Sequence, residues 1–499
     1  MRFLTTFLYT YFTLFVVFSK GRICEKLVYN QRYNHVDKIV RNYDISIANF
    51  KKMRYSKCTM IYDLIIIGAG AAGLFAAANV PDGFRTLVIE KTDSPGKKLL
   101  LTGSGQCNLT NDEPIKEFLN RYGENGKQLR PILFPFSNQA LMEYFESYGL
   151  ALTVRDDGKV FPASMKSKDV LNLLLELVKS KGVELRYNTY VTEISRTTHH
   201  VEISCNNKTT PFDNSDGYRY CIHTCVNPKK LHDSDDSKNF ENTKDSKSEG
   251  QFFAKSLLVA TGGESYPKTG SDGSIFERLE HLGLKLVPRR PALTSIYVEN
   301  YPYEELSGLT FPTVTAKVGL HKCEGSLLFT HKGFSGPPIL TLSRYVEAED
   351  KLTINYLPGR TADELRMDLI KLSSGEQKQI LTVLESLTKL PRSFLENVCS
   401  RCDINKSEKA SRLSGKQMGN LADRLTNDSH IISGTGGFAS AMTTAGGVDL
   451  DEINLQTMEA KRYPGLHFAG EVLDVDGDTG GYNLQFAFSS AMRCICSIL

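Results

Sequence analysis

The 499-residue sequence predicts an α/β protein in which a parallel-sheet domain is interrupted by an inserted domain of short strands and helices. Residues 62–90 read as strand, helix and strand, and a unit of this order and length is typical of a parallel sheet. Near residue 291 the pattern changes to short alternating strands separated by turn residues, and helical periodicity follows over residues 362–430. Residues 466–499 return to a buried strand, a glycine-rich loop and a helix, which we interpret as the completion of the first domain.

The composition is that of an ordinary globular chain, 41% hydrophobic and 23% charged. The net charge of +3 offers no electrostatic argument for a nucleic-acid partner, so none is expected. The 11 cysteines lack a framework of paired spacings, which favours free thiols over disulfides. Cys399 and Cys402 form a C-x-x-C pair without a second pair at zinc-like spacing, so we predict no metal site.

The first 59 residues differ from the rest and are excluded from the fold prediction. An uncharged apolar run over residues 3–18 is followed by a basic stretch, poor in acidic residues, that extends to Met60. This order is typical of a two-part leader into a membrane-bounded plastid, the location that we favour. Two alternatives stay open. A retained signal anchor would hold the chain at a membrane, which we do not expect for the mature chain, and a later start at Met53 or Met60 would leave it in the cytoplasm.

Residues 68–73, GAGAAG, form a G-x-G-x-x-G motif between a predicted strand and a predicted helix, the context in which this motif indicates a dinucleotide site. Gly68 permits the tight turn, Gly70 lets the backbone approach a pyrophosphate, and Gly73 lets the helix lie close to the sheet. The start of the helix offers unpaired N–H groups to the phosphates. Glu90 ends the next strand, where a carboxylate can accept from both ribose hydroxyl groups. The motif therefore predicts a Rossmann-like nucleotide-binding domain.

The C-terminal segment distinguishes FAD from NAD. An extended FAD lies across its domain, and its flavin end must be met by a second loop, whereas an NAD domain needs no partner segment at the far end of the chain. Gly470 and Glu471 follow an apolar strand, and Gly480 and Gly481 precede a helix whose N-terminus can face the flavin ring. We therefore predict an FAD-binding domain.

This interpretation divides the chain into four segments, of which the leader, residues 1–59, is the first. The FAD-binding domain begins with residues 60–290, and residues 205–250, which are polar and nearly free of apolar periodicity, are predicted to be a disordered surface insertion. Residues 291–431 are predicted to form an inserted β-barrel plus helical domain. Residues 432–499 complete the FAD-binding domain.

Several long segments make the chain similar to a known family, the aminoacetone oxidase-like FAD-binding flavoproteins, which includes a dehydro-bile-acid reductase. These are DLIIIGAGAAGLFAAA, GKKLLLTGSGQCNLTN, VFPASMKSKDVLNLLL, LLVATGGESYPKTGSDG, GSLLFTHKGFSGPPIL and the C-terminal run that contains GEVLDVDGDTGGYNLQ. They occur in the family's order and cover most of residues 62–495. The resemblance implies an FAD fold with an inserted barrel and helical domain.

The resemblance also implies which residues hold the cofactor. They fall in five groups: the glycine turn, the acidic end of the second strand, the loop beside the isoalloxazine ring, a second glycine turn, and the loop at the flavin end. In chain order they are Gly68, Gly70, Ala71, Ala72, Gly73, Glu90, Lys91, Lys98, Leu99, Gly103, Gly105, Cys107, Asn108, Ala260, Thr261, Gly262, Gly470, Glu471, Asp474, Gly480, Gly481, Tyr482, Asn483, Leu484 and Gln485.

Two positions in the predicted flavin loop depart from the family pattern. The family usually reads G-G-G-R-C-N, and this chain reads GSGQCN over residues 103–108, with Ser104 in place of a glycine and Gln106 in place of the arginine. The second exchange is the one that changes charge. The exchange removes a fixed positive charge from the expected site. It leaves open whether this chain keeps the family's substrate and redox tuning.

Three residues are candidates for proton transfer or redox chemistry. His331 lies in a predicted loop of the inserted domain, and imidazole exchanges a proton near neutral pH. Tyr266 carries a hydroxyl group next to the second glycine turn. Cys107 lies in the flavin loop without a second cysteine nearby, which favours a packing role over a redox-active disulfide.

The sequence therefore predicts an FAD-dependent oxidoreductase that acts on a small carbonyl, enone or amine substrate, with NAD(P)H or oxygen as redox partner. A separate NAD(P)H domain is not evident, so NAD(P)H would dock at the flavin. Two alternatives stay open: a flavin-binding protein whose cofactor is structural and which acts through partners or RNA, and an NAD-dependent dehydrogenase. The oligomeric state is not predicted.

Overall fold

The computed structural model describes residues 60–197, 200–205, 208–213, 219–226, 250–373 and 378–499. The predicted leader, residues 1–59, lies outside these ranges and stays a prediction. Within the described part, none of the helices is both long and apolar enough to cross a membrane. The same residues contain no group of three His, Cys, Asp or Glu side chains arranged to hold a metal ion.

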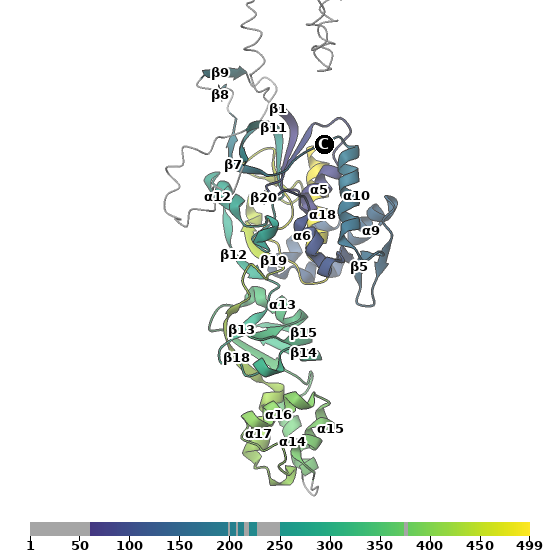
Figure 1. Ribbon diagram of the computed structural model, residues 1–499, viewed down its shortest axis with the longest axis vertical. Coiled ribbons are helices and arrows are strands. Elements are labelled where there is room, and N and C mark those ends of the chain that lie inside the picture. Colours follow the sequence, from purple (N-terminus) through teal and green to yellow (C-terminus); the bar gives the residue numbers. More distant parts are fainter. Residues whose placement is uncertain (1–59, 198–199, 206–207, 214–218, 227–249, 374–377) are drawn as a thin grey trace, which may run out of the picture. The chain divides into compact units, whose positions relative to one another are not determined.

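A nine-stranded sheet forms the centre of the FAD-type domain (Figure 1). Its middle strands run parallel in the order β22–β11–β1–β2–β6. Leu64, Ile65 and Ile66 of β1 are fully buried, because a strand covered on both faces has no polar side. The strands of this sheet are β1 (Met60–Ile67), β2 (Thr86–Ile89), β6 (Glu184–Arg186), β7 (Thr189–Arg196), β10 (Tyr220–Val226), β11 (Gly250–Val259), β20 (Ile453–Asn454), β21 (Glu459–Ala460) and β22 (Leu466–Phe468).

Two helices from opposite ends of the described chain pack together on this sheet. α5 (Ala71–Ala78) follows the glycine turn and α18 (Tyr482–Ile498) ends the chain, and they lie side by side in Figure 1. The rings of Phe75 in α5 and Phe488 in α18 are 4.9 Å apart between centroids. The C-terminal segment thus completes the domain that the glycine turn begins. The other helices here are α6 (Lys97–Leu101), α7 (Ile115–Phe118), α8 (Arg130–Leu133), α9 (Asn138–Ser147), α10 (Ser167–Ser180) and α12 (Ser274–His281).

One strand of the sheet lies inside the segment predicted to be a disordered insertion. β10 pairs antiparallel with β7 and β11, and Tyr220 and Ile222 are fully buried. The prediction for residues 205–250 is therefore wrong for residues 219–226. It is also wrong for β9 (Lys208–Asp213), which forms a separate two-stranded sheet with β8 (His200–Cys205). β10 was missed because strongly polar stretches flank it on both sides, and a polar window hides a short buried run. Residues 206–207, 214–218 and 227–249 lie outside the described ranges.

The inserted segment forms a closed barrel of six antiparallel strands, with a group of helices between its last two strands, and the sequence predicted a barrel plus helices here. Its core is separate from that of the sheet domain and includes Phe311, Phe329, Tyr356 and Phe394. The barrel strands are β13 (Ile296–Val298), β14 (Thr310–Val318), β15 (His321–Phe329), β16 (Gly333–Ser335), β17 (Lys351–Asn355) and β18 (Asp428–Thr435). The helices are α13 (Pro337–Leu342), α14 (Ala362–Ser373), α15 (Ile380–Thr388), α16 (Arg392–Arg401) and α17 (Gly415–Thr426).

Two further small sheets carry segments that lead to the functional site. β12 (Leu286–Ala292) pairs antiparallel with β19 (Thr443–Val448), and this ribbon carries both chain connections of the insertion. β12 and β18 run across the predicted boundaries at 290/291 and 431/432, so neither connection is a free linker. The second sheet contains β3 (Thr110–Asn111), β4 (Leu152–Val154) and β5 (Lys159–Pro162).

Candidate FAD site

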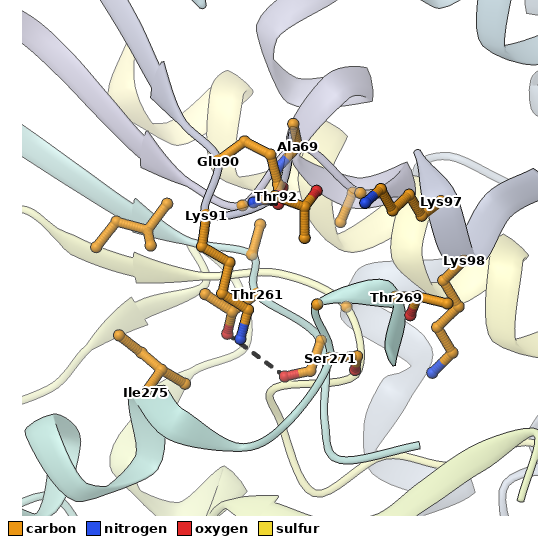
Figure 2. Close-up of a pocket in the computed structure, with 18 of the residues that line it drawn as sticks. Ala69, Glu90, Lys91, Thr92, Lys97, Lys98, Thr261, Thr269, Ser271 and Ile275 are labelled. Atoms are coloured by element: carbon orange, nitrogen blue, oxygen red, sulfur yellow. Dashed lines mark hydrogen bonds between the residues drawn. The ribbon is translucent and has the colours of Figure 1, made fainter. Parts of the chain in front are cut away.

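A cleft of about 1080 Å³, partly open to solvent, lies where β1, β2, β11 and β22 end (Figure 2). Loops that meet at the carboxyl ends of parallel strands are the usual ligand site of open α/β sheets. Of the predicted cofactor residues, those that line the cleft are Gly68, Gly70, Ala71, Ala72, Glu90, Lys91, Lys98, Ala260, Thr261, Gly262, Gly470 and Glu471.

The glycine turn has the backbone geometry that its spacing predicts. Gly68 has a φ of 102°, a conformation that favours glycine. A Cβ on Gly73 would lie 1.9 Å from the Gly68 carbonyl oxygen, whereas a Cβ on Gly70 would meet no atom within 4 Å. α5 begins there without a side-chain cap or an acidic residue in its first turn. Its free N–H groups therefore face the cleft, where they can bind an anion.

Glu90 joins the end of β2 to the glycine turn. One carboxylate oxygen accepts from the backbone N–H of Ala69 and the other from that of Thr92, both at 2.8 Å. Figure 2 shows Glu90 beside Ala69 at the edge of the cleft. Each carboxylate oxygen has a second lone pair, so a ribose hydroxyl group can still donate to it.

The opposite part of the cleft contains a charged cluster from four chain segments. Lys98 Nζ lies 2.6 Å from Glu471 Oε2. Glu471 Oε1 also accepts from the Ser265 hydroxyl at 2.8 Å and from the Thr444 N–H at 2.9 Å. Lys98 and Glu471 were predicted from the sequence, whereas Ser265 and Thr444 were not. Their contacts join residues far apart in the chain, and no local motif indicates them.

The predicted flavin loop lies next to the start of α18. The Asn108 side-chain amide, oriented to satisfy its neighbours, donates to the Thr110 and Val160 carbonyl groups at 2.9 and 3.2 Å and accepts from Gly481 N–H at 3.0 Å. The buried Gln485 amide oxygen accepts from the Thr110 hydroxyl at 2.6 Å. The structure therefore brings together the predicted residues of the two loops. The predicted residues outside the cleft lining are Gly73, Leu99, Gly103, Gly105, Cys107, Asn108, Asp474, Gly480, Gly481, Tyr482, Asn483, Leu484 and Gln485.

Comparison with known proteins identifies the family. Residues 62–215 and 222–496 match the family described as HI0933-like protein Rossmann domain. The chain belongs to this family. It is an FAD-dependent oxidoreductase, and the predicted resemblance, the predicted fold class and FAD as the predicted cofactor are thereby confirmed. The alternative of an NAD-dependent dehydrogenase is wrong.

Three curated relatives of this flavoenzyme align over almost their whole length. The ribosomal RNA dihydrouridine synthases of Haemophilus influenzae and Escherichia coli are 30% and 29% identical, and each alignment covers 87% of this chain and 98% or 97% of the relative. A 3-dehydro-bile acid Δ(4,6)-reductase from Clostridium scindens is 28% identical, over 85% of this chain and 96% of the relative.

The cleft of the flavoenzyme fits the adenosine half of FAD. The uncapped start of α5 would meet the pyrophosphate and the buried Glu90 carboxylate the ribose. Lys98 and Glu471 would lie toward the flavin, since the chain continues from Lys98 through α6 into the predicted flavin loop. These roles follow from geometry and charge.

None of the three predicted catalytic residues lines the cleft. His331 is exposed between β15 and β16 of the barrel. Tyr266 is half-buried in a left-handed conformation with a φ of 55°. Cys107 is fully buried, and burial raises the pKa of its thiol to about 12, so a thiolate is scarce at neutral pH. Their catalytic roles stay predictions.

A second charged cluster joins the flavin-end loop to the barrel. Arg344 is 4% exposed at its side chain, and its guanidinium nitrogens lie 3.1 Å from Asp476 Oδ2 and 3.0 Å from Asp478 Oδ1. Asp474 accepts from Gly446 N–H at 3.0 Å. Burial raises the pKa of all three carboxyl groups, and that of Asp476 reaches about 6. The loop that precedes Gly480 and Gly481 is thus held by an arginine of the insertion.

Proposed function

We propose that this flavoenzyme reduces a carbon–carbon double bond conjugated to a carbonyl group. The observation that carries the proposal is the shared chemistry of the relatives. Uracil, the base that a dihydrouridine synthase reduces, has its C5=C6 bond conjugated to the C4 carbonyl, and a 3-dehydro steroid with a Δ4 bond has the same arrangement. This choice narrows the predicted carbonyl, enone or amine substrates to the enone class.

A uracil base of ribosomal RNA is the first substrate to test, because two of the three relatives carry that activity in their names. Such a substrate departs from our expectation of no nucleic-acid partner. That expectation rested on the net charge, and a net charge of +3 says nothing of where the 60 basic and 57 acidic residues lie. A small enone is the second substrate to test, as the third relative suggests.

Bound FAD would supply the hydride chemistry. The residues of this chain would bind and orient it: the glycine turn and α5 would hold the pyrophosphate, Glu90 the ribose, and Lys98 with Glu471 the segment toward the flavin ring. Lys98 and Glu471 compensate each other's charge, so they add hydrogen bonds to the cleft without adding net charge.

NAD(P)H is the proposed electron donor. The glycine-rich residues 434–437 do not form a second strand–turn–helix motif, because they end barrel strand β18. NAD(P)H would therefore deliver its hydride at the flavin rather than bind in a domain of its own.

The test is anaerobic reduction followed by a single turnover. Purified residues 60–499, loaded with FAD, are mixed with NADH and NADPH in parallel. The reduced protein is then mixed with a ribosomal RNA transcript or with a conjugated ketosteroid. We expect rapid bleaching of the flavin by one nicotinamide, recovery of its absorbance with one substrate, and a product heavier by two hydrogens in the mass spectrum. Bleaching by an amine, with no recovery by either alkene, would contradict the proposal.

A further inference from the structure

Residues 102–107 form an unusual turn at the end of α6. Gly103, Ser104, Gly105 and Cys107 all have positive φ values, of 56°, 56°, 86° and 62°. Ser104 and Cys107 are not glycine, and L-residues adopt this conformation only where the surroundings impose it. The turn is held by the bond from Cys107 N–H to the Thr102 carbonyl group, at 2.9 Å. Strain of this kind concentrates at binding and catalytic sites.

An arginine from a separate hairpin contacts this turn. Arg155 Nη2 donates to Gln106 Oε1 at 2.6 Å. The Arg155 guanidinium also lies over the Phe161 ring, with its carbon atom 4.0 Å from the ring centroid. A Cβ on Gly103 would approach the same ring to 3.3 Å, so the turn and the arginine share one aromatic support. These two contacts orient an exposed side chain that would otherwise sample many rotamers.

Within its own hairpin, Arg155 attracts Asp157 electrostatically but has no direct ion pair with it. Asp157, two residues further on, pairs with Lys159 at 2.6 Å. Arg155 donates one N–H to the neutral Gln106 amide, and a guanidinium group has five N–H donors. Because the side chain is exposed, its other N–H groups are open to a ligand.

The surroundings suit a planar conjugated substrate. Lys97 and Lys98 at the start of α6 line the cleft, and the turn follows at the other end of this short helix. Leu101 precedes the turn in the chain and is 50% exposed, and Val154 precedes Arg155 and is 45% exposed. The Arg155 guanidinium, held at the turn by Gln106 and Phe161, can bind a molecule that carries an electron-rich oxygen.

We propose that Arg155 binds the carbonyl oxygen of the conjugated substrate, and that Gln106 and Phe161 are its positioning residues. The inference rests on the proposed function. When hydride adds to the β-carbon, the π electrons of the double bond move toward the carbonyl oxygen and an enolate forms. The guanidinium stabilises that negative charge, and a proton from solvent then adds to the α-carbon.

The test uses the full flavoprotein with sulfite as the probe. Sulfite is an anion that adds to oxidised flavin, and its affinity reports positive charge beside the ring. We expect R155Q to weaken sulfite binding about tenfold and to raise KM for the conjugated substrate, because one nearby charge contributes on the order of 1 kcal/mol. R155K should retain most of the sulfite affinity but lose the orientation that a planar fork provides.

Two further variants separate charge from structure. The double variant Q106R/R155Q exchanges the two partners of this contact, so the positive charge is carried by residue 106. Its sulfite affinity should therefore recover from the R155Q value toward that of the parent. R130Q removes another exposed arginine, which lies over the Phe134 ring at 4.9 Å, and should change nothing. FAD content and Tm show that each variant is folded.

The two proposals fail in different ways. A protein that binds no FAD contradicts the proposed function and this inference together. A protein that binds FAD, and whose R155Q variant keeps the sulfite affinity and KM of the parent, contradicts the inference alone.

Discussion

Gly70 and Gly73 belong to one turn, yet the space around them predicts opposite effects of the same substitution. A methyl group at position 73 would meet the Gly68 carbonyl oxygen at 1.9 Å, so G73A should lower the free energy of unfolding by about 1–3 kcal/mol. Gly70 has open space and a φ of −82°, which alanine adopts. G70A should therefore keep its stability within about 0.5 kcal/mol and lose FAD affinity, because the methyl group fills the approach to the pyrophosphate.

Urea unfolding of the apoprotein and titration with FAD measure the two effects separately. Equal FAD affinity in G70A and the parent would show that the cofactor does not approach this turn. Equal stability in G73A would show that the turn can shift by more than the structure implies.

Predictions for single residues agree with the structure where the spacing of nearby residues in the sequence determines their position. Gly68, Gly70, Gly73 and Glu90 follow one backbone pattern, and the structure places all four as that pattern requires: Gly73 packs closely, and the other three line the cleft. Ser265 and Arg155 could not be predicted in the same way. Ser265 contacts Lys98 across 167 residues of sequence, and Arg155 contacts Gln106 across 49. A local sequence pattern does not indicate contacts between segments so far apart.

Arg155 also bears on the departure from the family pattern at Gln106. The sequence alone implied that a positive charge was lost from the flavin loop. In the structure the Gln106 side chain is the acceptor that holds the Arg155 guanidinium at this loop. The positive charge that Gln106 does not supply is therefore supplied at this loop by Arg155, which lies elsewhere in the sequence.

At the scale of elements, buried runs were predicted well and short strands in polar surroundings were not. β1 ends in the continuous apolar run of residues 64–67, and the sequence predicted this strand. β10 is a short buried run between strongly polar stretches, and its pairing with β7 and β11 makes it a strand. Such a strand depends on tertiary pairing, which a local window does not contain.

The aspartate-rich loop before α18 carries a prediction about pH. Burial raises the pKa of Asp476 to about 6, while Arg344 beside it acts in the opposite direction. The folded state thus binds a proton more tightly than the unfolded state, whose Asp titrates near 3.9. This group therefore makes the protein less stable as pH rises from about 4 to 6. Between pH 5 and 7.5, the free energy of unfolding of D476N relative to the parent should increase by about 1 kcal/mol.

Denaturant unfolding at both pH values measures this difference, and D449N is the matched control. Asp449 pairs with Lys285 at 2.6 Å, which lowers the pKa of its carboxyl group. It is ionised in both states throughout this pH range, so its substitution should have the same effect at pH 5 and 7.5. A D476N effect that is also independent of pH would contradict the assignment of a buried, proton-binding carboxyl group.

At the scale of the whole molecule, the chain builds two cores rather than one. The core of the barrel and its helices comprises residues between Ile296 and Ile432, and the core of the sheet domain comprises residues before and after this segment. The change of sequence pattern near residue 291 anticipated this division. The exact connections could not be predicted, because β12 and β18 run across the two boundaries and β12 pairs with β19, which no local pattern indicates.

The inserted domain also satisfies its own buried charge. The Asp428 side chain is fully buried, and one of its oxygens accepts from the Tyr356 hydroxyl at 3.1 Å and contacts His430 Nε2 at 2.8 Å. Arg401 of α16 lies 3.6 Å from the other oxygen. All of these groups belong to the insertion, so the network does not depend on the sheet domain.

These observations predict that the two domains can be separated. A fragment of residues 293–442 should fold alone, unfold cooperatively in urea and bind no FAD, because its core and its buried carboxylate are complete within it. The complementary chain, with residues 293–442 replaced by a short Gly–Ser turn, keeps β12 beside β19 and every residue of the cleft, but it lacks Arg344, which holds the flavin-end loop. It should therefore still bind FAD, with lower affinity than the parent. It should lose turnover only if the barrel contributes to substrate binding. Circular dichroism, urea unfolding and FAD titration of both chains test this. FAD binding by the fragment, or its loss from the complementary chain, would show that the cofactor site extends into the barrel.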